Sequence, residues 1–237
     1  NNLFMSIAEH MGFVFEKTAQ SITIKERLDF SCAIFDRDGE LVANAPHMPV
    51  HLGSMDSTVK SIIKNNSTLS PGDLFAINAP YNGGTHLPDI TIVNPIWNSK
   101  KSEIIFFTAA RGHHTDVGGL TPGSMPCNST DIHEEGIYID NWTIVDHGVF
   151  KDDASKNKLL SGSYPARSPL TNIADLKAQI AACKKGETEL LKVVDKYGLE
   201  TVFRFQELVC RNAEDAVRES IKTIKETEVT YYMDNDL

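Results

Sequence analysis

The sequence of 237 residues contains few cysteines, and none of them is paired at a metal-binding or redox spacing. Cys32, Cys127, Cys183 and Cys210 lie far apart and form no C-x-x-C motif, which indicates unpaired thiols in a reducing compartment. No apolar run approaches the ~20 residues of a membrane span, and no basic leader precedes an apolar segment. We therefore expect cytoplasmic residence and no membrane partner.

The sequence also lacks blocks rich in lysine and arginine, and its formal net charge is −9. This balance argues against a nucleic-acid partner, because the phosphate backbone attracts basic surfaces. Neither phosphate-binding pattern, G-x-x-x-x-G-K-[ST] or G-x-G-x-x-G, occurs in the chain. Any nucleotide chemistry must therefore take place elsewhere, and small neutral or cationic molecules and other proteins remain as partners.

The order of apolar patterns predicts an α+β fold, with a mixed or antiparallel sheet, flanking helices and a helical C-terminal third. Helical spacing covers 1–23, starts again near residue 172, is interrupted at Gly186 and resumes over 190–194. Another helix is expected over 200–227. A proline-containing linker at 161–171 suggests an α+β metal-binding catalytic region over 1–165 and a helical region over 166–237. The chain starts with Asn directly in a helical pattern, so we expect it to be a fragment of a longer subunit.

The stretch from Tyr81 to Gly119 contains most of the candidate chemistry. Residues 89–97 alternate as a half-buried strand does, and residues 103–110 form an apolar run typical of a central strand. A polar turn centred near Lys100 predicts an antiparallel hairpin that places Asp89 across from about Arg111. The segments around His86 and His113 therefore meet at one end of the sheet.

Two imidazoles and a carboxylate in one place form a usual ligand set for Zn, Mn or Fe. His-Leu-Pro-Asp could equally be a loop with an Asx turn, so spacing alone leaves both interpretations open. His113 and His114 should point to opposite faces of a strand, so only one of them is expected to bind the ion. The other could support that ligand or transfer a proton.

Two further segments could contribute to a substrate pocket. Residues 44–54 form a proline-bracketed loop with His47 and His51, followed by a helix over 55–64 for which Ser54 is the expected N-cap. Gly83 and Gly84 could let the backbone approach a ligand closely. The glycine- and proline-rich loop at 118–126 is long enough to cover a site.

Eight blocks of the sequence together resemble the hydantoinase B/oxoprolinase family, in the family's order and over nearly the whole chain. They are M-S-I-A-E-H-M-G, K-E-R-L-D-F-S-C-A, P-H-M-P-V-H-L-G-S-M, Y-N-G-G-T-H-L-P-D, R-G-H-H-T-D-V-G-G, P-G-S-M-P, E-E-G-I and N-I-A-D-L-K-A-Q-I-A-A. The chain resembles the N-terminal portion of an N-methylhydantoinase B-type subunit. Family subunits are longer, so a C-terminal portion is expected to be absent.

The resemblance implies that ATP is bound by an A-type partner subunit, which phosphorylates the substrate, while the B-type subunit holds a divalent metal. It places the metal ligands at His86, Asp89, His113 and either Glu26 or Asp29. The expected function is hydrolysis of a small cyclic amide of the hydantoin or 5-oxoproline type within a hetero-oligomer. In that reaction His114 or Asp116 would orient a water molecule, and Gly83, Gly84 and His51 would contact the substrate.

Two alternatives stay open at this level. The chain could belong to a carboxylase of the acetone or acetophenone type, which the resemblance also includes. It could instead be a shortened assembly element without catalytic activity.

Overall fold

The computed structural model describes residues 2–232, and a seven-stranded sheet forms its centre. Across the sheet the strand order is β2-β1-β5-β4-β3-β6-β7, and every neighbouring pair is antiparallel. The strands are β1 (Phe30–Asp36), β2 (Leu41–Asn44), β3 (Leu74–Ile77), β4 (Asp89–Trp97), β5 (Ile104–His113), β6 (Trp142–Asp146) and β7 (Val149–Phe150). The expected α+β fold is therefore confirmed.

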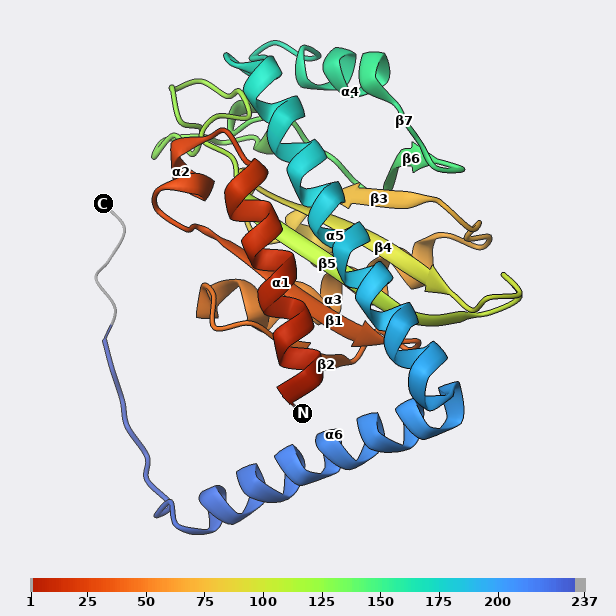
Figure 1. The fold of residues 1–237 in the computed structure, drawn as a ribbon. Helices are drawn as coiled ribbons and strands as arrows, with labels where there is room; N and C mark the ends of the chain where they lie inside the picture. Colours follow the sequence, from red (N-terminus) through yellow and green to blue (C-terminus); the bar gives the residue numbers. More distant parts are fainter. Residues whose placement is uncertain (1, 233–237) are drawn as a thin grey trace.

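Helices cover both faces of this sheet. Figure 1 shows α1 and α5 side by side over one face, with α3 behind the other. The α-helices are α1 (Asn2–Thr18), α2 (Ile22–Lys25), α3 (Pro49–Asn65), α4 (Asp152–Leu159), α5 (Pro169–Tyr197) and α6 (Leu199–Lys222), and the 3-10 turns are η1 (Pro80–Asn82) and η2 (Ile132–Glu134). None of the helices in the described part of the chain is long and apolar enough to cross a membrane.

Side-chain alternation along the central strands divides the core into two layers. In β5, Phe106 and Ala110 pack in the cluster that contains residues of α1 and α5, whereas Phe107 and Ala109 pack in the cluster of α3. Both layers are apolar because successive residues of a strand point to opposite faces, and both faces of this sheet are covered. Residues at odd positions of β5 therefore face α3.

The β4–β5 hairpin has a different register from the predicted one. Asp89 pairs with His113, not with Arg111, so the expected register is wrong by two residues. The turn lies slightly further along the chain than Lys100, and an irregularity between Ile96 and Trp97 adds another residue of offset. The observed register brings Asp89 directly opposite a histidine.

Helix α3 begins earlier than the sequence pattern indicated. It starts at Pro49 with Met48 as the N-cap residue, so Ser54 is inside the helix and the expected N-cap is wrong. Proline is favoured in the first turn because its missing N–H needs no partner there. The longer helix places His51 in its first turn, facing the sheet.

Helix α5 is continuous through Gly186, so the expected interruption is also wrong. An added Cβ at Gly186 would come within 2.5 Å of Met11 Sδ and 2.8 Å of Thr108 Cγ2. The glycine lets α5 lie close to α1 and β5 at this crossing. Because residues of α5 belong to the same core cluster as those of α1, the helix packs directly on the sheet. The domain boundary near residue 165 stays a prediction.

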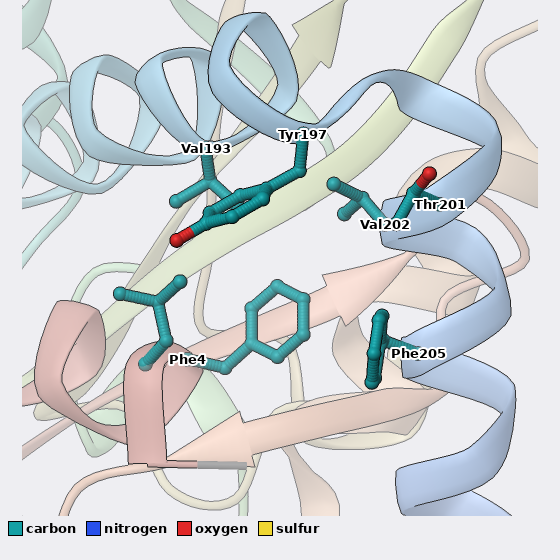
Figure 2. Close-up of a pocket in the computed structure, with 7 residues that line it drawn as sticks. Phe4, Val193, Tyr197, Thr201, Val202 and Phe205 are labelled. Carbon is teal, nitrogen blue, oxygen red and sulfur yellow. The ribbon is translucent and has the colours of Figure 1, made fainter.

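Helix α6 leaves the end of α5 and extends past the sheet, as Figure 1 shows. An apolar cavity of about 230 Å³ lies where α1, α5 and α6 meet, and Figure 2 shows its side chains. Its lining residues are Leu3, Phe4, Val193, Tyr197, Thr201, Val202 and Phe205. The only polar side-chain groups among them are two hydroxyls, so this cavity does not carry the candidate chemistry.

Candidate metal centre

Three neighbouring strands place polar residues at the same end of the sheet. His113 at the end of β5 pairs with Asp89 at the start of β4, and its backbone N–H donates to the carbonyl of Asp29 just before β1. Asp89 and His113 occupy odd positions of their strands and share the α3 side with Thr91 and Arg111. The pattern of antiparallel pairing therefore gathers one carboxylate from each of two separate segments around a histidine.

His86 completes a compact cluster, because the turn that leads into β4 brings it over Asp89. Its Nδ1 lies 3.2 Å from Asp89 Oδ2, and its Nε2 lies 3.2 Å from His113 Nδ1. His113 Nδ1 lies 3.1 Å from Asp89 Oδ1. One ligand atom from each of these three residues lies within 4.8 Å of the others. Such convergence of N and O donors suits a divalent ion.

His51 connects Asp29 with this cluster. Its Nε2 lies 3.5 Å from Asp29 Oδ1 and 3.4 Å from Asp89 Oδ2. The hydroxyl of Ser31 donates to the carbonyl of Met48, so its oxygen is available to accept from His51 Nδ1 at 3.2 Å. That arrangement leaves Nε2 of a neutral imidazole directed at two carboxylates. A proton on His51 Nε2 or a bound cation would balance these two carboxylates.

The electrostatic environment keeps Asp89 ionised. Burial opposes its charge, but hydrogen bonds with His113 and His86 outweigh burial and hold the pKa of Asp89 well below its ordinary value. The hydroxyl of Thr85 also donates to Asp89 Oδ2 at 2.9 Å. Burial lowers the pKa of His51, although Asp89 acts in the opposite direction. The cluster therefore contains an ionised Asp89 carboxylate beside His51, and burial favours the neutral form of His51.

Exposure separates the buried side of the cluster from its accessible side. Asp89 and His51 are only 1% and 2% exposed, whereas the side chains of His86, His113 and Asp29 are 33%, 21% and 28% exposed. The cluster is therefore open to solvent on the His86 side. His51 lies behind the two carboxylates, and its predicted contact with a substrate stays a prediction.

Glu26 and Asp29 have different positions, although the sequence could not separate them. Glu26 is the exposed C-cap residue of α2, whereas Asp29 contacts His51 at the cluster. The reason is local, because the chain turns from α2 into β1 over residues 26–29. Glu26 stays at the end of α2, and Asp29 directly precedes β1. The geometry favours Asp29 as the fourth ligand.

His114 points to the opposite face from His113, as alternation predicted. It is fully buried against α5, where its Nε2 lies 3.0 Å from Gln179 Oε1 and its Nδ1 lies 3.1 Å from Asn172 Nδ2. Gln179 uses its Nε2 on the carbonyls of Ile90 and Ala110, so its oxygen accepts from His114. Both ring nitrogens are therefore satisfied within the core. These contacts do not favour the predicted catalytic role of His114.

Asp116 lies in the loop after β5 and also stays outside the cluster. Its carboxylate accepts from the backbone N–H groups of Gly118, Gly123 and Arg167, and from the Arg167 guanidinium at 2.8 Å. Burial opposes the charge, but these hydrogen bonds lower the pKa of Asp116 overall. The contacts show that Asp116 organises the 118–126 loop, and its predicted role in orienting water stays a prediction.

Gly83 and Gly84 lie close to protein backbone. An added Cβ at Gly83 would come within 2.6 Å of the Ser57 carbonyl, and one at Gly84 within 2.5 Å of the Asn78 carbonyl oxygen. Gly83 also has a φ of 89°, which L side chains rarely adopt. These glycines therefore let the turn before His86 pack against α3 and the segment that follows β3, and substrate contact there stays a prediction.

Two residues of the site, Thr85 and Arg111, were not among the candidates predicted from the sequence. Thr85 hydrogen-bonds Asp89, and Arg111 is completely buried beside it. A signal for Arg111 was present, because an arginine within an apolar central strand must find buried partners. Its partners come from three distant segments, so no local pattern indicated what they were.

The fold and the cluster together define a class of protein. It is an α+β chain that presents a candidate divalent-metal centre at one end of an antiparallel sheet. The family model for "Hydantoinase B/oxoprolinase" matches residues 1–237. The chain belongs to this family, which confirms the resemblance found in the sequence.

The relatives support the same placement. The chain is 46% identical to "5-oxoprolinase 1" of Arabidopsis thaliana over 236 residues, covering 94% of this chain and 18% of that protein. It is 30% identical to a putative D-/L-hydantoinase subunit of a Pseudomonas species, covering 98% of this chain and 40% of the relative. The crystal structure of an ATP-dependent caprolactamase from Pseudomonas jessenii matches with a TM-score of 0.84 and 25% identity, covering 95% of this chain and 38% of that one. The chain thus spans less than half the length of each.

Proposed function

We propose that this chain carries the divalent-metal centre of an ATP-dependent hydrolase that opens small cyclic amides. The observation that carries the proposal is the convergence of ligand atoms from His86, Asp89 and His113 within 4.8 Å of one another. Asp29, connected through His51, is the proposed fourth ligand. The names of the relatives supply the reaction class, since they include a 5-oxoprolinase, a hydantoinase component and a caprolactamase.

The residues present fit a metal ion of the Zn, Mn or Fe type. Imidazole and carboxylate donors suit these ions, and His51 directs Nε2 at the carboxylates of Asp29 and Asp89. When bound, such an ion would polarise a carbonyl oxygen or lower the pKa of a water molecule toward ~7. The protein's own part is to direct these donors at one point and to supply the Thr85 hydroxyl, which donates to Asp89 Oδ2 at 2.9 Å.

An A-type partner subunit or domain is proposed to bind the ATP. Support comes from the sequence, which lacks both phosphate-loop patterns, and from the Pseudomonas relative, whose name describes one subunit of a hydantoinase. The proposed assembly is a hetero-oligomer in which the partner activates a hydantoin- or 5-oxoproline-type substrate. The accessible side of the cluster, around His86, would then receive the activated amide.

Metal analysis of four purified proteins tests this proposal. Inductively coupled plasma mass spectrometry should find near-stoichiometric metal in the wild type and little in His86→Ala and Asp29→Asn. Glu26→Gln is the matched control, because its carboxylate is exposed outside the cluster, and it should retain the metal. Ring opening, assayed with the A-type partner and ATP, should be lost in the same two variants. Full activity of a metal-free His86→Ala protein would contradict the proposal.

Two other outcomes would redirect the assignment. If product appears only when bicarbonate is supplied, the chain serves a carboxylase. If neither the wild type nor a reconstituted sample binds metal, the chain is an assembly element of a larger enzyme.

A further inference from the structure

Arg111 is a completely buried arginine in the middle of the candidate site. It lies on β5 two residues before His113 and on the same face, toward α3. Burying a guanidinium is costly unless its hydrogen-bonding groups are satisfied. Arginine stays charged in proteins, so this buried guanidinium needs acceptors for its five N–H groups.

All five N–H donors of Arg111 have acceptors. Nε donates to Thr91 Oγ1 at 2.8 Å, and one terminal nitrogen donates to Ser54 Oγ at 2.6 Å and to the His51 carbonyl at 3.2 Å. The other terminal nitrogen donates to Thr58 Oγ1 at 2.8 Å and to the Gly83 carbonyl at 3.4 Å. Each acceptor is a neutral oxygen. The planar fork of a guanidinium is therefore fully used, which a lysine could not reproduce.

Each of these acceptors lies close in sequence to a cluster residue. Thr91 follows Asp89 on β4, and Gly83 precedes His86 in the same turn. Ser54 and Thr58 belong to α3, whose first turn carries His51. Arg111 itself sits on the strand that ends at His113. One side chain thus joins the segments that carry His51, His86, Asp89 and His113.

We propose that Arg111 is a positioning residue that sets the spacing of the metal ligands through its five hydrogen bonds. The inference rests on the proposed function, because it assumes that the cluster binds a divalent ion. Arg111 touches neither the ion nor the substrate in this role. It acts by holding α3, the glycine turn and β4 at fixed distances from β5.

The test compares Co²⁺ binding by the full chain in the wild type, Arg111→Lys and Arg111→Met. Co²⁺ reports both affinity, by titration, and ligand geometry, through its visible absorption spectrum. Loss of residues that orient metal ligands typically weakens binding by about 10- to 100-fold. We expect that loss in both variants, together with an altered Co²⁺ spectrum, because Lys keeps the charge but not the fork.

Ile62→Ala is the control for general destabilisation. Ile62 is fully buried on α3 away from its first turn, so its truncation should lower the melting temperature and leave Co²⁺ affinity and spectrum unchanged. If neither Arg111 variant folds, Thr91→Val removes only the acceptor of Nε and should still weaken Co²⁺ binding. A wild-type affinity and spectrum in Arg111→Lys, or in Thr91→Val where that variant is needed, would overturn the inference. A wild type that binds no Co²⁺ would instead overturn the proposed function on which it rests.

Discussion

Replacing His114 with alanine tests whether this histidine supports the core or takes part in the reaction. The substitution removes a fully buried imidazole and leaves Gln179 Oε1 without its donor. Truncating a buried ring costs about 3–5 kcal/mol in comparable cores, and an unsatisfied buried acceptor alone accounts for about 1–3 kcal/mol. Asn172 keeps its bond to the Asp116 carbonyl, so we expect the total to stay near the lower figure.

A loss of about 3–4 kcal/mol is large beside a typical unfolding free energy of about 5–15 kcal/mol. For a chain of this size it corresponds to a fall in melting temperature of roughly 10 °C. Circular dichroism during heating measures that fall, and metal analysis of the folded variant should still find the ion. The comparison protein is His86→Ala, which should lose the metal with little change in the stability of the metal-free chain.

The structural interpretation of His114 fails if the variant melts near the wild-type temperature and yet loses activity while retaining metal. That combination would return His114 to the catalytic role expected from the sequence. Loss of metal from a fully folded His114→Ala protein would also contradict the structural interpretation, because His114 bonds Gln179 and Asn172 and not the cluster.

Further predictions concern pH and packing. Burial lowers the pKa of His47 from 6.5 to about 4, so the unfolded chain takes up the proton first as the pH falls. His47 should therefore contribute fully above pH 6.5 and lose about 1–2 kcal/mol between pH 6.5 and 4. Urea unfolding across that range should show a smaller pH dependence for His47→Gln, and an imidazole pKa near 6.5 by NMR would contradict the reasoning. Gly186→Ala should lower stability by about 1–2 kcal/mol through overpacking against Met11 and Thr108. Gly53→Ala, a helical glycine with open space around it, should instead raise stability by up to about 1 kcal/mol in thermal unfolding.

Local patterns were sufficient for most of the secondary structure. Alternation over 89–97 and the apolar run after Glu103 predicted β4 and β5, because strand periodicity is a property of neighbouring residues. The helical third was confirmed for the same reason. The starts and breaks were less reliable. Pro49 as a helix start and Gly186 as a tolerated helix residue both depend on what packs beside them, which the pattern does not contain.

For the candidate site, too, the sequence predicted some features and the structure decided others. The motifs named His86, Asp89 and His113, and alternation correctly separated His113 from His114. The preference for Asp29 over Glu26 required the structure, because it depends on which residue lies beside β5 once α2 has turned into β1. The family resemblance could supply both acidic residues but not their positions.

The sequence by itself determined the family, the α+β class and the residue types that could bind a metal, since these follow from short motifs and from periodicity. Tertiary structure alone decided the register that pairs Asp89 with His113, and the contacts of His51 with two carboxylates. It also decided the partners of the buried Arg111. These features join residues 20 to 60 positions apart in the chain. The pairing of β4 with β5 brings together Asp89 and His113, and the packing of α3 against the sheet adds the contacts of His51 and Arg111.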